Sequence, residues 1–251
     1  MSHNQEQLCK TCGRQIRQGV RFCSHCGTAA PNEEHEEYVA GTNSLRTLLW
    51  LYGSLLVFIV FIRLLKFVSG AGWNFMVDIL FSLIIFRFAL RNRNELRPLL
   101  SFKNISVLKV LITIGVSVIF AGLVLLFSGW LKQTIFHSGV FSEEYLFDDT
   151  AYPLLFSILS IAVQPAIFEE IGFRGLIYDQ LNKAGGPQAA LLVSSFMFAI
   201  LHLSIISLLW LVPIGLALGW MRQRYNTLWY GMIAHFCYNV CVVLYNFLTR
   251  G

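Results

Sequence analysis

Long apolar segments fill most of the chain after residue 44, and they constrain the fold more than any other feature of the sequence. A helix needs about 20 consecutive apolar residues to cross a hydrocarbon layer about 30 Å thick. Apolar segments of roughly this length lie near 45–65, 71–90, 105–130, 151–178, 187–204, 206–221 and 227–248. Because a backbone inside a bilayer must satisfy its own hydrogen bonds, these segments predict an all-α, polytopic transmembrane bundle of about seven spans.

The composition also indicates a location in lipid. Hydrophobic residues make up 56% of the 251 positions and charged residues only 13%, which is about half the share in an average soluble domain. The first span lies behind a polar head, so it is not a cleaved signal peptide. The formal net charge of +5 is spread along the chain and does not form the concentrated basic surface of a nucleic-acid-binding protein. We expect a multi-pass protein of the cell membrane, with membrane lipids and not nucleic acid as partners.

Residues 1–30 contain two Cys-x-x-Cys-Gly motifs separated by ten residues. Their cysteines are Cys9, Cys12, Cys23 and Cys26. Each motif lets two thiolates reach one ion, so the pair predicts a tetrahedral structural zinc site. The segment has too few apolar residues for a core of its own, and metal binding would supply most of its folding free energy. A disulfide-linked head and a redox dithiol are the less favoured alternatives. A reduced zinc ribbon belongs in the cytosol, where it could bind a partner.

An acidic stretch separates this ribbon from the apolar body. Residues 31–44 carry four glutamates without apolar periodicity and predict a solvated linker, so the transmembrane bundle occupies 45–250. Basic residues should gather in the cytosolic connections. With the amino terminus inside, these connections hold Arg46, Arg91, Arg93, Arg97, Lys103, Lys183, Arg222 and Arg224. Arg63 and Lys66 oppose this orientation, although long basic side chains can reach either interface.

Three polar sets with helical spacing lie in three of the late spans. Glu170 and Arg174 are four residues apart, so they share a helix face and can form an ion pair, while Glu169 is turned away from them. The other two sets are Phe198 with His202, and His235 with Asn239. Ionisable residues inside a bilayer cost several kcal/mol each and need a partner or a function.

These residue types are compatible with several functions. A buried pair of Glu170 and Arg174 can be purely structural, and a lone histidine or asparagine in a membrane can serve as an interhelical hydrogen-bonding group. Together, a glutamate beside two histidines has what the activation of water requires, namely a base and hydrogen-bond donors for an oxyanion. A proton-relay transporter would use the same types, so residue type alone does not choose.

The spacing and order of the motifs add a family resemblance. Glu-Glu-x-x-x-Arg at 169–174, Phe-x-x-x-His at 198–202 and His-x-x-x-Asn at 235–239 resemble the CPBP family. That family groups type II CAAX prenyl endopeptidases with bacteriocin-processing and immunity proteins, also called Abi proteins. The resemblance covers about residues 150–245, and it implies an intramembrane endopeptidase that acts on a membrane-associated peptide or protein. The alternative is a non-catalytic membrane protein, either a bacteriocin immunity factor or a proton-coupled transporter.

The resemblance also implies a role for each residue of the motifs. Glu169 would be the general base that acts on water with His202. His235 and Asn239 would stabilise the oxyanion. Glu170 and Arg174 would hold this geometry.

The sequence leaves two readings of metal use at this site. Two histidines and a carboxylate can ligate a catalytic zinc ion with an open position for water. However, no His-x-x-x-His pair lies on one helix, and Asn239 is a better hydrogen-bond donor than a zinc ligand. We therefore favour a metal-independent mechanism in which Glu169 and His202 activate water directly. Pro165 lies inside a span and is expected to kink the helix just before the carboxylates.

Overall fold

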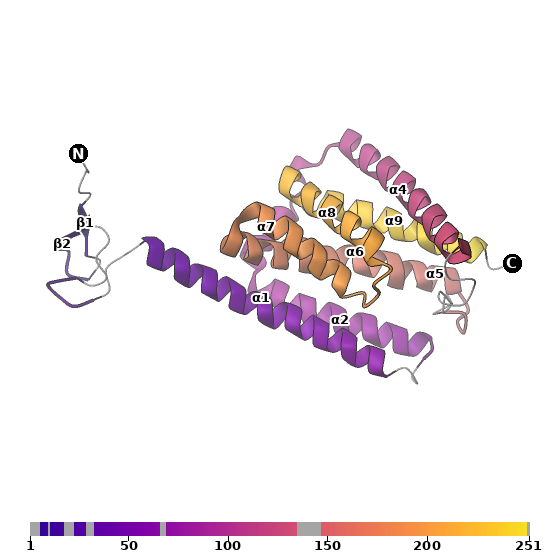
Figure 1. Cartoon of the computed structure of the whole chain (residues 1–251), viewed down its shortest axis with the longest axis horizontal. Helices are drawn as coiled ribbons and strands as arrows, with labels where there is room; N and C mark the ends of the chain where they lie inside the picture. The colour runs from indigo at the N-terminus through magenta and orange to yellow at the C-terminus, as the bar shows by residue number, and fades with distance from the viewer. Residues whose placement is uncertain are drawn as a thin grey trace.

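The computed structural model describes residues 6–9, 11–17, 23–28, 33–65, 69–134 and 147–249. Its two short strands, β1 (Glu6–Leu8) and β2 (Gln15–Arg17), pair antiparallel with Leu8 opposite Gln15. The long helices are α1 (Glu33–Leu64), α2 (Ala71–Arg91), α4 (Val107–Thr134), α7 (Tyr178–Ile200), α8 (Leu208–Tyr225) and α9 (Trp229–Leu248). The short ones are α3 (Arg93–Leu99), η1 (Phe102–Asn104), α5 (Pro153–Ser157), η2 (Ile158–Val163), α6 (Gln164–Glu169) and η3 (Glu170–Ile177). The predicted all-α membrane-type bundle is confirmed (Figure 1).

The number of membrane spans differs from the prediction of seven. Among the described residues, five helical ranges are long and apolar enough to cross a membrane. They are Ser44–Leu64, Ala71–Arg91, Val107–Leu131, Pro153–Ile200 and Trp229–Leu248. The helix α8 is not among them, because Arg222, Gln223 and Arg224 lower the mean hydropathy of its last turns. The count of seven is therefore not confirmed.

The fourth of these ranges contains a reversal of the chain. It has 48 residues, and a straight helix of that length would be about 72 Å long at 1.5 Å per residue. Gly186 breaks it with a φ of 80° and a ψ of 173°, a conformation that favours glycine, and Pro187 follows. Beyond the break, Phe198 packs edge to face on Phe173 with ring centroids 5.3 Å apart. The two halves of the range thus lie side by side.

The first helix extends into the predicted linker. The helix α1 begins at Glu33, whereas its candidate span begins at Ser44. The acidic stretch is therefore helical from residue 33 onward. Glutamate and alanine are good helix formers, and an existing helix grows more easily than a new one starts, which explains the extension.

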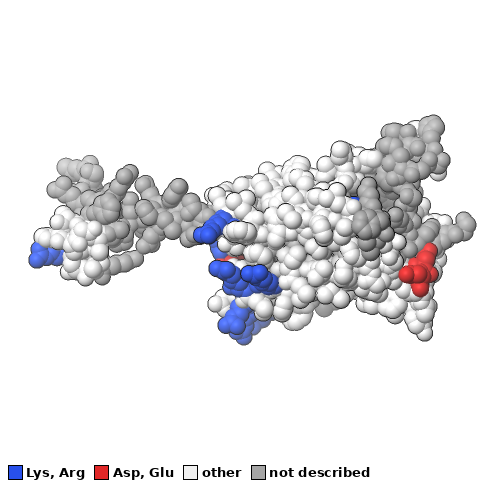
Figure 2. All heavy atoms as spheres, turned by 90° about the horizontal axis from the view of Figure 1, so that it is seen from below, with Lys and Arg blue, Asp and Glu red and all other residues white. Residues whose placement is uncertain are grey.

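Basic side chains gather at one end of the helical body and acidic side chains at the other (Figure 2). Arg91 ends α2, and Arg222 and Arg224 lie in the last turn of α8. At the other end of α2, the carboxylate of Asp149 accepts a hydrogen bond of 3.1 Å from the backbone N–H of Ala71. This distribution is the one that a membrane protein shows when its basic end faces the cytosol.

Small residues let α7 and α8 approach closely. A Cβ atom at Gly215 would lie 3.0 Å from the Cβ of Ser195, and one at Gly219 would lie 2.7 Å from Leu191. Gly215 and Gly219 form the small-xxx-small pattern that favours helix contacts in membranes. The close packing brings the backbone of α8 to the polar centre of the bundle.

Candidate active site and metal centre

The two adjacent carboxylates lie at the junction of α6 and η3, where the helix changes to π-helical winding. Such local widening of a helix is frequent at functional sites. The side chain of Glu170 is 1% exposed, whereas that of Glu169 is 17% exposed. Neighbours in sequence thus occupy two environments, one closed and one open.

Glu170 is held by an arginine of its own helix. Arg174 Nη1 donates to Glu170 Oε1 at 2.9 Å, and Arg174 Nη2 donates to the carbonyl of Gly215 at 3.3 Å. The guanidinium also lies 4.4 Å from the centroid of the Phe198 ring, which is a cation–π distance. The arginine charge is therefore compensated from three sides, and it ties η3 to α7 and α8.

A glycine of α9 makes room for the same carboxylate. A Cβ atom at Gly231 would lie 2.5 Å from Glu170 Oε2. This oxygen is buried and has no hydrogen-bond partner among the described residues. The absence of a side chain at position 231 lets α9 pack directly on Glu170.

His235 lies between the two glutamates. Its Nδ1 is 3.3 Å from Glu170 Oε1, and its Nε2 is 3.9 Å from Glu169 Oε2. Arg174 already donates a hydrogen bond to Glu170. A further hydrogen bond from His235 Nδ1–H to Glu170 would fix the imidazole ring and direct its Nε2 toward Glu169. The imidazole thereby links the closed carboxylate to the open one.

Glu169 and His202 line one cavity of about 230 Å³. Arg63 of α1 and the rings of Phe173 and Phe198 also line it. His202 lies just after the end of α7, where its Nδ1 is 3.1 Å from the carbonyl of Phe198. The next residue, Leu203, has a φ of 50°, a left-handed conformation that costs about 1–2 kcal/mol outside glycine. This turn directs the chain away immediately after the histidine.

Asn239, one turn after His235 on α9, contacts the element η2. Its Nδ2 donates to the carbonyl of Ile161 at 2.8 Å. Pro165 lies four residues after Ile161 and has no N–H, so this carbonyl lacks its normal helical donor. Asn239 supplies that donor, and α9 is thereby fastened to η2. Its direct participation in an oxyanion site stays a prediction.

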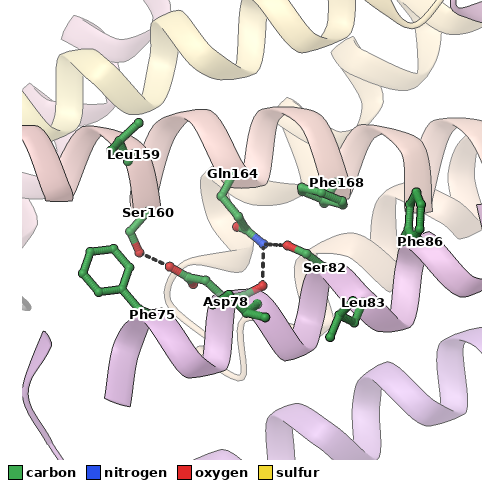
Figure 3. Close-up of a pocket in the computed structure, with 10 residues that line it drawn as sticks. Phe75, Asp78, Ser82, Leu83, Phe86, Leu159, Ser160, Gln164 and Phe168 are labelled. Atoms are coloured by element: carbon green, nitrogen blue, oxygen red, sulfur yellow. Dashed lines mark hydrogen bonds between the residues drawn. The ribbon is translucent and has the colours of Figure 1, made fainter. Parts of the chain in front are cut away.

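A second polar cluster joins α2 to the helix that carries the glutamates (Figure 3). Ser160 donates to the carboxylate of Asp78, and Gln164 Nε2 donates to Ser82 Oγ at 3.0 Å and to the Asp78 carbonyl at 3.5 Å. Phe75 and Phe168 are among the rings that line the adjacent cavity of about 380 Å³. These bonds fix η2 and α6 against α2, and thus help to position Glu169.

The sequence alone did not single out several residues of this site. In the sequence, Arg63 indicates only topology, and Gly215 and Gly231 carry no sign of a role at the site. The Gly-x-x-x-Gly spacing at 215–219 was a signal for close helix packing. Nothing in the sequence indicates that Gly231 faces a carboxylate, because that contact joins elements far apart in the chain.

The cysteine motifs fold into two matching turns. Cys9 N–H donates to the Arg14 carbonyl and Gly13 N–H to the Cys9 carbonyl, and Cys23 makes the equivalent pair of bonds with Thr28 and Gly27. Both glycines are left-handed, with φ values of 69° and 71°. This explains why a glycine follows each Cys-x-x-Cys.

The four sulfur atoms of Cys9, Cys12, Cys23 and Cys26 lie within 4.8 Å of one another. The Cys9–Cys26 and Cys12–Cys23 sulfur distances are 3.6 and 3.7 Å, far longer than a disulfide bond of about 2.05 Å. Four thiolates around zinc at about 2.3 Å would be separated by nearly this amount. Backbone N–H groups of Cys12 and Thr11 lower the pKa of Cys9 to about 6. The donor set therefore fits a structural zinc ion.

The ligand atoms of Glu169, His202 and His235 are less converged. Within the described part of the chain, only the four cysteines form a group of metal-ligand type in which all the donor atoms lie this close together. The metal-independent mechanism at the glutamates remains a prediction.

A membrane-type helical bundle with a paired buried glutamate and a second, cavity-facing one is consistent with a membrane-embedded hydrolase. Residues 151–241 match the family described as Rce1-like, type II CAAX prenyl endopeptidase, which is a family of membrane-embedded proteases. Residues 8–29 match the zinc-ribbon domain. The chain therefore carries an Rce1-like region and a zinc ribbon, as the motifs predicted. No curated protein and no solved structure gave a match.

Proposed function

We propose that this protein is an intramembrane endopeptidase in which Glu169 activates a water molecule to hydrolyse a peptide bond of a membrane-associated substrate. The proposal rests on one observation, the different environments of the two glutamates. Glu170 is closed in by Arg174 and His235, whereas Glu169 faces the cavity that His202 also lines. Of the two side chains, that of Glu169 is the more exposed, at 17% against 1%, and it lines this cavity.

Each step of the reaction has a residue to perform it. Glu169 accepts a proton from water while His202 orients that water, and the resulting hydroxide attacks the peptide carbonyl carbon. The carbonyl oxygen becomes an oxyanion, which a hydrogen bond from the imidazole of His235 stabilises. When the carbon–nitrogen bond breaks, Glu169 returns its proton to the leaving amine. Water is consumed, and a carboxyl and an amino terminus are formed.

Glu170 and Arg174 act on this chemistry through His235. The bond from His235 Nδ1 to Glu170 Oε1 fixes the orientation of the imidazole ring. We assign Asn239 a positioning role, since its amide N–H is engaged by the Ile161 carbonyl. In this assignment it fixes the ring of His235 one turn away on α9.

The test compares the peptides of membranes that contain wild-type protein with those of membranes that contain Glu169→Gln. The substitution keeps size and hydrogen bonding but removes the base, which costs on the order of 10² to 10⁴ in rate. We expect cleavage products that disappear in Glu169→Gln while the thermal stability of the purified variant is unchanged. Glu95→Gln is the matched control, because Glu95 is an exposed carboxylate paired with Lys183.

Unchanged cleavage by Glu169→Gln would show that the base is another group. Membranes in which wild-type protein changes no peptide would favour the non-catalytic alternatives, an immunity factor or a proton-coupled transporter.

A further inference from the structure

The connection between α2 and α4 forms a groove at the basic end of the bundle. Its helix α3 buries Leu96 and Leu99 and exposes Arg93 and Arg97. The groove has a volume of about 1050 Å³. Its polar lining consists of Arg93, Asn94, Arg97, Ser101 and Lys103. None of these residues belongs to the candidate active site.

The groove carries three positive charges without a matching negative one. Within the described part of the chain, no carboxylate lies within 4.0 Å of Arg93, Arg97 or Lys103. The carboxylate of α3 itself, Glu95, is paired with Lys183 at 2.8 Å and does not line the groove. Lysine and arginine side chains gather at this end of the molecule (Figure 2). The groove therefore attracts an anion.

The floor of the groove is apolar, and its α2 residues belong to the candidate span Ala71–Arg91. It includes Phe86 and Leu90 of α2, which are 51% and 55% exposed, together with Ala89 and Ile171. A free anion would leave this floor uncovered. A ligand that fits both parts must carry a negative head and a hydrocarbon chain.

We propose that this groove binds an anionic phospholipid. The phosphate lies among Arg93, Arg97 and Lys103, where guanidinium groups can donate pairs of hydrogen bonds to its oxygens. An acyl chain covers Phe86 and Leu90. Basic pockets between transmembrane helices on the cytoplasmic side bind lipid head groups by this combination of contacts.

Hydrogen bonds and side-chain packing connect α3, which lines the groove, to the elements of the candidate active site. The carbonyl of Leu99 accepts hydrogen bonds of 3.0 Å from Leu228 N–H and from the Thr227 hydroxyl. Leu96 lies so close to Gly175 that a Cβ there would be 2.6 Å from its side chain. The helix α3 thus packs on η3 and on the start of α9, which carry Glu170 and His235. A lipid bound to α3 therefore restrains the helix on which η3 and α9 pack.

The experiment measures lipid retention by native mass spectrometry of the full chain taken from nanodiscs of equal phosphatidylcholine and phosphatidylglycerol. Wild type should retain phosphatidylglycerol in preference to phosphatidylcholine. The triple variant R93Q/R97Q/K103Q should lose this preference by about tenfold or more, since each basic residue near a membrane surface contributes about 1 kcal/mol. The double variant R93K/R97K should keep most of it, because it retains the charge.

The matched control is R46Q/K109Q/R224Q, which removes three basic residues outside the groove. It should change the preference less than twofold if the groove is the site. Equal loss in both triple variants would overturn the proposal in favour of general surface charge. Displacement of phosphatidylglycerol by millimolar inorganic phosphate would show that the groove binds a free anion, and it would overturn the proposal of a lipid ligand. Neither readout requires a peptide substrate, so the result is independent of the proposed protease activity.

Discussion

At the scale of single residues, the environment of each carboxylate decides its role. Glu170 and Arg174 are both buried and charged, and they compensate each other. Their spacing of four was visible in the sequence, and the ion pair follows from helix geometry. The partners that α8 and α9 supply, the Gly215 carbonyl and His235, could not be predicted, because they depend on how distant helices pack.

Removal of the arginine should affect folding more than chemistry. Arg174→Ala leaves Glu170 as an uncompensated buried charge, which costs about 3–5 kcal/mol. We expect a large loss of folded protein and a lower thermal unfolding temperature in detergent. The control is Arg224→Ala at the surface end of α8. Equal stability of Arg174→Ala and wild type would contradict the ion pair.

Gly231 offers a finer perturbation of the same carboxylate. In Gly231→Ala, the new methyl group would lie 2.5 Å from Glu170 Oε2, so the carboxylate or α9 must shift, at a cost of about 1–3 kcal/mol. Peptide hydrolysis should fall together with stability. Gly115→Ala in α4 is the control, since a Cβ there meets nothing within 4 Å. If both variants behave alike, the close approach of α9 to Glu170 is not required.

At the scale of elements, the site depends on irregular helices. The sequence predicted a kink at Pro165, and the structure shows π-helical winding on both sides of α6. It did not predict that Asn239 supplies the donor that Pro165 lacks, because the residues lie on different helices. A proline reveals that a carbonyl is left free, but not which side chain satisfies it.

A double-mutant cycle tests this compensation. Asn239→Leu should lose about 1 kcal/mol of stability, because the Ile161 carbonyl is left without a donor. In Pro165→Ala the backbone N–H can bond to Ile161, so adding Asn239→Leu should then cost little. Thermal unfolding of the four proteins gives the coupling free energy. Additive effects would mean that Asn239 and Pro165 act independently.

At the scale of the whole molecule, the chain combines a zinc ribbon with a membrane bundle. The four cysteines were predictable because a local motif defines them. The span count of seven was not confirmed. The sequence separated 151–178 from 187–204, and the structure breaks the chain between them at Gly186, but α8 ends in basic residues and is not among the candidate spans. Average hydropathy does not decide whether a span that ends in basic residues crosses the membrane.

The ribbon and the glutamate site should differ in their need for metal. Full-length protein should contain one zinc ion per chain, and C23S/C26S should contain none while it still cleaves peptide. Elemental analysis and a hydrolysis assay on the same samples measure both. Two results together would contradict the metal-independent mechanism. The first is a second zinc ion that His235→Ala loses, and the second is the return of activity when zinc is added to metal-stripped protein.

The orientation of the bundle can be measured with engineered cysteines. If the basic end faces the cytosol, Arg93→Cys should react with an impermeant maleimide only after the cells are opened, and Thr249→Cys should react in intact cells. Wild-type protein is the control for the native cysteines. The reverse pattern would invert the predicted topology and place the basic groove outside.

The position of His235 and Asn239 on the helix α9 also bears on biosynthesis. Glu170 and Arg174 lie one turn apart on one segment, so they can neutralise each other while that segment leaves the translocon. Glu169 has no such local partner, and the imidazole beside it arrives with a helix that is synthesised later. A nascent chain that has not yet inserted α9 therefore holds an incomplete site, and under the proposed mechanism it could not hydrolyse peptides before this helix has been inserted.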